Sequence, residues 1–219
     1  MGIEIKDLRI GEKIIFGTHH TRQTPLTWIK VSPDTFISEF STGNFVWDTV
    51  ENRGFNTDYE LSNVHQFLHS TEVNWFSPSH SADVCEYACK ITPGFLSQFS
   101  EEEIEAIEEL ELPYSQNIAS DIKTERYPYF RKHGIRARNM TVHEVFDTTL
   151  CRDVSYGRPV TIGKDANISY YNLRGGLRPV LKFKPGVSIL VSETGIIVTG
   201  ASVKLDIVSN EEFEAFLMS

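Results

Sequence analysis

PLTWIKVSPDTFISEF, residues 25–40, contains two short runs in which apolar and polar side chains alternate. In the second run, Phe36 and Ser38 alternate with Ile37 and Glu39. Such alternation is typical of β-strands that pack one face against a core, because successive side chains point to opposite faces. We therefore predict two strands here, and a further strand in the preceding run IGEKIIFG (10–17).

Strand signals return in the last third of the chain. Val, Ile and Phe are again concentrated in short runs, and Gly or Pro residues that favour turns separate those runs. The runs are RPVTIG (158–163), RPVLKFK (178–184), VSILVS (187–192) and GIIVTG (195–200). NFVWDTV (44–50) is predicted to extend the sheet formed by the first strands. Sheet-forming segments thus lie at both ends of the chain.

A first helix is predicted to begin near Asp58 or Tyr59, after a loop rich in Gly, Asn and Asp. Apolar residues then recur every three or four positions, which places their side chains on one helix face. The members of this stripe are Leu61, Val64, Phe67 and Leu68.

A second helix is predicted from Ser100, because Glu103 follows it at the spacing of a capping box. Seven glutamates between 101 and 111 are interpreted as a favourable first turn and a solvated helix face. Ser209 and Glu212 have the same capping-box spacing and predict a short C-terminal helix. Strands and helices in this order predict one α+β domain.

Composition narrows the function classes. The chain has 219 residues and a net charge of −9, and no more than two Lys or Arg residues are adjacent, so a nucleic-acid partner is not expected. The longest apolar run is about four residues, so no membrane span is expected. Charged side chains are distributed through the first dozen positions, where a signal peptide would have an apolar segment. We expect a cytoplasmic protein of the host cell, or a virion protein.

Four residues have the chemistry of metal ligands. His65 and His69 lie four residues apart on the first predicted helix, and Cys85 and Cys89 follow with the same spacing. The run HQFLH lacks the glutamate of the metalloprotease motif H-E-x-x-H, and C-x-x-x-C matches structural zinc sites poorly. A histidine beside an apolar stripe more commonly bonds a carbonyl. The metal therefore stays unknown, and no cofactor is predicted.

Tyrosine and arginine alternate with turn residues in CRDVSYGRP (151–159) and NISYYNLRGG (167–176). Recognition surfaces favour these two residue types, because they provide contact area and directed hydrogen bonds at low entropic cost. The loops of 152–175 are therefore the predicted binding surface. Its members are Arg152, Asp153, Tyr156, Arg158, Tyr170, Tyr171 and Arg174.

The order of several segments along the chain resembles that of a known family. They are GEKIIFG (11–17), PLTWIKV (25–31), TFISEF (35–40), GFN (54–56), SNVHQFLH (62–69), FSEEEIEAI (99–107), TLCRD (149–153) and GLRPVLKFK (176–184). This series resembles a domain-of-unknown-function family of bacterial and phage proteins that carries S-D-I-R-x-W-L-N, F-S-x-E-E and G-V-R-P-A-L patterns. His65 and His69 replace the Arg and Asn of that pattern, Cys151 replaces a Leu, and residues 76–98 resemble an insertion.

The resemblance covers about residues 10–185 and implies a fold similar to the C-type-lectin-like and sulfatase-modifying-factor group, which presents variable loops to proteins or glycans. We expect a single compact domain over 1–219, with an irregular, mostly antiparallel sheet, two or three helices, and C-terminal strands and a helix in 186–219. The predicted function is a non-catalytic, phage- or mobile-element-associated protein that binds a protein or glycan. Alternatives are an inhibitor of a bacterial defence complex that acts by protein–protein contact, and a metal-dependent enzyme.

Overall fold

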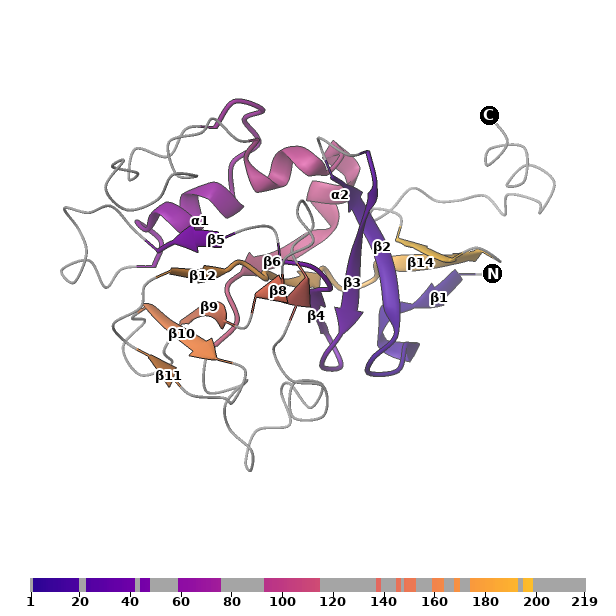
Figure 1. Ribbon diagram of the computed structural model, residues 1–219. Helices are drawn as coiled ribbons and strands as arrows, with labels where there is room; N and C mark the ends of the chain where they lie inside the picture. The colour runs from indigo at the N-terminus through magenta and orange to yellow at the C-terminus, as the bar shows by residue number, and fades with distance from the viewer. Residues whose placement is uncertain are drawn as a thin grey trace.

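The structure of the protein is a computed structural model. It describes residues 2–19, 23–41, 44–47, 59–75, 93–114, 137–138, 145–146, 148–152, 159–163, 168–169, 174–192 and 195–198. Within these ranges it is an α+β fold with mostly antiparallel sheets and two short α-helices (Figure 1), which confirms the predicted α+β class; the C-type-lectin-like fold stays a prediction. No helix in these ranges is long and apolar enough to cross a membrane. The predicted C-terminal helix after Ser209 lies outside the described residues. The prediction of a single domain over 1–219 is therefore not tested.

The larger sheet has eight strands in the order β1-β14-β15-β2-β3-β4-β13-β6. Their bounds are β1 Gly2–Glu4, β2 Lys13–Thr18, β3 Pro25–Lys30, β4 Thr35–Ser38, β6 Ile107–Glu111, β13 Val180–Phe183, β14 Ser188–Ser192 and β15 Gly195–Val198. Neighbours are antiparallel except β15 and β2, which are parallel. Strands predicted at both ends of the chain thus meet in one sheet.

The smaller sheet has five strands in the order β11-β10-β9-β12-β5 (Figure 1, left). Their bounds are β5 Asn44–Val46, β9 Thr148–Arg152, β10 Pro159–Gly163, β11 Ile168–Ser169 and β12 Arg174–Gly176. A further pair consists of β7 Ala137–Arg138 and β8 Val145–Phe146. The strand predicted in 44–50 exists as β5, but it pairs with β12 rather than extending the larger sheet.

Helix α1, Asn63–Leu68, begins later than predicted. The Ser62 side chain accepts a hydrogen bond from the backbone N–H of His65 at 3.2 Å and thereby caps the helix. Val64, Phe67 and Leu68 are buried as expected, whereas Leu61 precedes the helix and is 62% exposed. The predicted apolar stripe is therefore confirmed for the three residues within the helix and is wrong for Leu61.

Helix α2, Glu101–Ala106, has the predicted capping box between Ser100 and Glu103. The helix is shorter than the glutamate run suggested, because β6 begins at Ile107. Pairing with β13 places Leu110 opposite Leu181, and Leu110 is buried. Burial of Leu110 and pairing of the strand backbone therefore outweigh the helical preference of the glutamates. Two 3-10 helices, η1 Ile5–Asp7 and η2 Phe95–Gln98, complete the helical elements described.

The core of the larger sheet is aromatic. Trp28 is fully buried, and its indole N–H donates to the carbonyl of Phe16 at 2.8 Å. The Phe95 ring meets the Trp28 ring edge-on with centroids 6.3 Å apart, and the Phe99 ring lies 5.3 Å from that of Phe16. Strands β2 and β3 are thus packed against the segment that leads into α2.

Gly17 is required where β2 meets α2. Its φ is +82°, and a Cβ there would lie 2.6 Å from the Phe99 ring. The Gly17 N–H donates to one carboxylate oxygen of Glu103 at 2.9 Å, while the other oxygen accepts from the Ser100 N–H at 2.8 Å. The capping glutamate therefore also fastens α2 to β2.

Candidate functional site

The predicted binding surface is only partly covered by the described residues. Arg152 is described in full as the last residue of β9, and Arg174 is described through its backbone as the first residue of β12. The remaining predicted residues lie outside the described residues: Asp153, Tyr156, Arg158, Tyr170 and Tyr171. What the structure shows of this region is therefore the strands that flank these residues.

Arg152 is buried, with 8% of its surface exposed. Its guanidinium carbon lies 4.3 Å from the ring centroid of Tyr59 and 4.4 Å from that of Tyr114. These distances are those of cation–π contacts, and Arg152 also forms an ion pair with Glu111. The structure gives Arg152 an internal role, and its predicted contact with a ligand stays a prediction.

The backbone of Arg152 joins the two sheets. Its N–H donates to the carbonyl of Pro113 at 3.0 Å, and Arg152 forms a parallel bridge with Tyr114. Pro113 and Tyr114 directly follow β6, the edge strand of the larger sheet, whereas Arg152 ends β9 of the smaller one. We call Arg152, Glu111, Tyr59 and Tyr114 the sheet junction.

Burial changes the protonation equilibria within the sheet junction. It raises the pKa of Tyr59 to about 12, although the nearby positive charge of Arg152 acts in the opposite direction. The Tyr59 hydroxyl oxygen accepts a hydrogen bond from the Leu112 N–H at 3.0 Å. Burial also lowers the pKa of Arg152, against the influence of Tyr59, Glu109 and Glu60. Tyr59 is therefore a neutral hydrogen-bond acceptor and cation partner at ordinary pH.

The strand register separates two of the predicted binding residues. Gly176 of β12 lies beside Thr149 of β9 in parallel orientation. Arg174 is two residues before Gly176, and Arg152 is three residues beyond Thr149, so they are offset by five residues, roughly 16 Å along the strands. The structure does not bring Arg152 and Arg174 together.

The pairing within the smaller sheet also shows that two of its strands, β9 and β11, run toward the same end. Arg152 at the end of β9 lies opposite Pro159 at the start of β10. Ser169, the last residue of β11, lies opposite Thr161, and β11 runs in the direction of β9. Strands β9 and β11 therefore run toward the same end of the smaller sheet.

His65 in α1 and His69, the C-cap residue of that helix, lie side by side, as their spacing predicted. Their ring centroids are 4.0 Å apart and the rings are nearly parallel, at 30°. The Nδ1 atom of His69 is 2.9 Å from the backbone carbonyl oxygen of His65, which is the carbonyl contact expected from the sequence. No group of three or more His, Cys, Asp or Glu residues that could hold a metal occurs in the described ranges. Cys85 and Cys89 lie outside those ranges.

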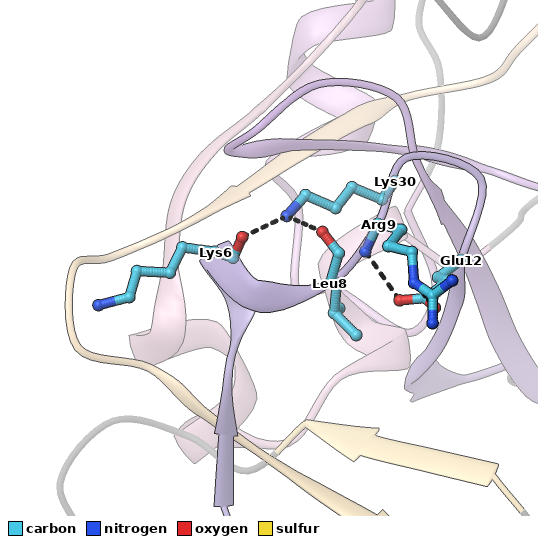
Figure 2. A network of polar contacts seen from close by, with 5 residues as sticks. All are labelled: Lys6, Leu8, Arg9, Glu12 and Lys30. Carbon is cyan, nitrogen blue, oxygen red and sulfur yellow. Dashed lines mark hydrogen bonds and ion pairs between the residues drawn. The ribbon is translucent and has the colours of Figure 1, made fainter.

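A second buried cation escaped the sequence analysis. Lys30 is 1% exposed, and its ammonium group donates to the carbonyls of Ile5 at 2.7 Å, Lys6 at 3.3 Å and Leu8 at 2.8 Å. Figure 2 shows this ammonium group between the carbonyl oxygens of Lys6 and Leu8. Strand alternation was the available signal, because it places Lys30 on the face of buried Trp28.

Two further polar side chains near the sheets are internal. Arg178 is buried and donates from Nε and Nη2 to the Ser38 carbonyl, at 3.0 and 2.8 Å. Cys151 is also buried, and burial raises the pKa of its thiol. A thiol kept protonated is a poor nucleophile and a poor metal ligand. Neither residue has the chemistry of an exposed reactive group.

No known protein family, curated protein or solved structure matches this chain. The resemblance drawn from the order of the segments therefore stays a prediction.

Proposed function

We propose that this chain is a non-catalytic binding protein, associated with a phage or mobile element, that contacts a protein or glycan through loops 152–175. One observation supports the proposal: β9, which ends at Arg152, and β11, which ends at Ser169, run toward the same end of the smaller sheet. The segments that follow these residues contain Tyr156, Tyr170 and Tyr171.

The sheet junction supports this proposal because it would hold the start of the first loop in a fixed position. A recognition loop needs a rigid scaffold, because ordering a mobile loop on binding costs conformational entropy. Arg152 immediately precedes the first of these segments and is held by Glu111 and two tyrosine rings. We propose that the scaffold is of the C-type-lectin-like kind, in which loops rather than the sheet contact the ligand.

Glycan-array binding and affinity capture of host proteins test this proposal on the full chain. Tyr156→Ala and Tyr170→Ala should each weaken a specific interaction at least about tenfold, as expected for aromatic anchors. Val73→Ala is the matched control, because Val73 is 54% exposed and belongs to neither the loops nor the sheet junction. If both tyrosine variants keep every interaction of the wild type, the loops are not the binding surface.

A second candidate is an inhibitor of a bacterial defence complex that engages a basic partner. The supporting observation is that four glutamates around α2 are exposed: Glu101, Glu102, Glu105 and Glu108. Such a contact should weaken as added salt screens the charges. Capture that persists unchanged in high salt, or in a variant with all four changed to Gln, would exclude it.

A further inference from the structure

We propose that the turn after β1 contains a binding site for a primary ammonium group, which the side chain of Lys30 fills in this chain as a tethered ion. The site consists of the backbone carbonyls of Ile5, Lys6 and Leu8. It is distinct from the proposed loop surface, and a free primary amine should occupy it when the lysine side chain is shortened.

The distances within the site fit an ammonium group. The Nζ atom of Lys30 is 2.7, 3.3 and 2.8 Å from the carbonyl oxygens of Ile5, Lys6 and Leu8. An ammonium group has three N–H donors and no acceptor, so it can donate one hydrogen bond to each carbonyl. Calcium–oxygen bonds of about 2.3–2.6 Å and magnesium–oxygen bonds of about 2.0–2.1 Å are shorter than all three distances. A potassium ion has no donors and is held by whole rings of carbonyls. Three oxygens at these distances therefore favour the ammonium group.

The 3-10 helix η1 makes these carbonyls available. The last carbonyls of a helical turn have no partner within that turn. The Ile5 carbonyl accepts from the Leu8 N–H at 3.3 Å, and its second lone pair can accept from Lys30. Lys30 approaches from β3, and Figure 2 shows its side chain extended toward this turn. The site is thus formed by one short turn and is filled from a neighbouring strand.

Backbone hydrogen bonds hold the site in shape independently of the lysine side chain. The Gly11 N–H donates to the Lys30 carbonyl at 2.8 Å, and the Lys30 N–H donates to the Glu12 carbonyl at 2.9 Å. The Glu12 carboxylate also accepts from the Arg9 N–H at 2.8 Å (Figure 2). None of these bonds uses the Lys30 side chain, so they can persist when Lys30 is replaced by Ala.

The charges around the site favour a cation. Burial lowers the pKa of Lys30, and the carboxylates of Asp7, Glu12 and Asp34 act in the opposite direction. A neutral amine has only two N–H groups, so one of the three carbonyls would face its lone pair. The three contacts therefore fit the charged form, and the same carboxylates would attract a free ammonium ion.

Thermal unfolding of the full-length Lys30→Ala variant at pH 7 tests this site. The n-propylammonium ion contains the same carbon and nitrogen atoms that the substitution removes. Its chloride salt should raise the melting temperature of the variant saturably, by at least about 3 °C over tetramethylammonium chloride at equal concentration. Tetramethylammonium has the same charge but no N–H donor. Hydrogen exchange in residues 2–9 should slow in n-propylammonium chloride as well.

Lys30→Met is the matched control, because its side chain fills the space that the amine would enter. Its melting temperature should be the same in both salts. An equal rise in Lys30→Met, an equal rise of Lys30→Ala in potassium chloride, or no difference between the two salts for Lys30→Ala would overturn the proposal. If Lys30→Ala does not fold in tetramethylammonium chloride, the refolding yield decides. Recovery in n-propylammonium chloride then supports the site, and failure in both salts contradicts it.

Discussion

Lys30 and Arg152 are both buried cations, but the protein neutralises them in different ways. Lys30 donates to the backbone carbonyls of Ile5, Lys6 and Leu8 and so binds the N-terminal turn to β3. Arg152 is paired with the carboxylate of Glu111 and lies against two tyrosine rings. A carbonyl cage supplies partial charges that stay neutral overall, whereas the sheet junction leaves a full negative charge when Arg152 is removed.

The largest effect is therefore expected for Arg152→Met. The variant loses both cation–π contacts and leaves Glu111 without its cation, with 25% of its side chain exposed. Breaking a buried pair from one side costs several kcal/mol, and we expect the free energy of unfolding to fall by about 3 kcal/mol. Urea unfolding followed by circular dichroism measures it. A loss below about 1 kcal/mol would mean that the guanidinium contributes little to the packing of the two sheets.

The sheet junction also predicts an effect of alkaline pH on stability. Because the pKa of Tyr59 is raised to about 12 in the folded state, the folded protein holds its proton over a range in which the unfolded chain loses it. Stability should therefore fall as pH rises from about 10 to 12, by up to roughly 2–3 kcal/mol. Tyr59→Phe should flatten this part of the curve; an unchanged slope in the variant would assign the loss to other groups.

Lys30→Met should cost about 2 kcal/mol, somewhat less than Arg152→Met. The methionine fills most of the space, but the three carbonyls lose their shared donor, and unsatisfied buried acceptors cost about 1–3 kcal/mol. Neutralising a nearby carboxylate, as in Glu12→Gln, should not restore the stability of the variant, because the cage depends on carbonyls. Restoration by Glu12→Gln would show that charge pairing dominates at Lys30 as well.

The smallest effect is expected for Lys13→Met, the exposed comparison. Lys13 pairs with Glu39, but its side chain is 52% exposed, so water screens the pair. We expect a change of less than about 0.5 kcal/mol in the same urea experiment. A loss as large as that of Lys30→Met would show that burial does not determine how much each cation contributes to stability.

Local signals were read correctly from the sequence. The Ser100–Glu103 capping box depends on residues three apart, and the structure contains it. The carbonyl contact of His69 likewise involves one helical turn. The glutamates after Ala106 were interpreted as a helix face but lie in β6, since the choice between helix and strand at Ile107 is made by pairing with β13, far along the chain. Alternation of Leu110 and Leu112 with glutamates was the available signal for that strand.

The sheet junction could not be predicted, although the sequence pointed to Arg152. The Arg and Tyr content of 152–175 marked it as a recognition residue. Its partners Tyr59, Glu111 and Tyr114 come from distant segments. The bridge between Arg152 and Tyr114 and the hydrogen bond from the Leu112 N–H to Tyr59 bring them together. An arginine beside tyrosines thus has the same local sequence whether it contacts a ligand or the protein's own core.

The most direct test of this account is a double-mutant cycle between Arg152→Met and Glu111→Gln, measured by urea unfolding. Each single variant leaves one charged partner in the sheet junction, whereas the double variant removes both charges. We expect the double variant to be at least about 2 kcal/mol more stable than the sum of the two single losses implies. A coupling energy near zero would contradict the claim that this ion pair joins the two sheets.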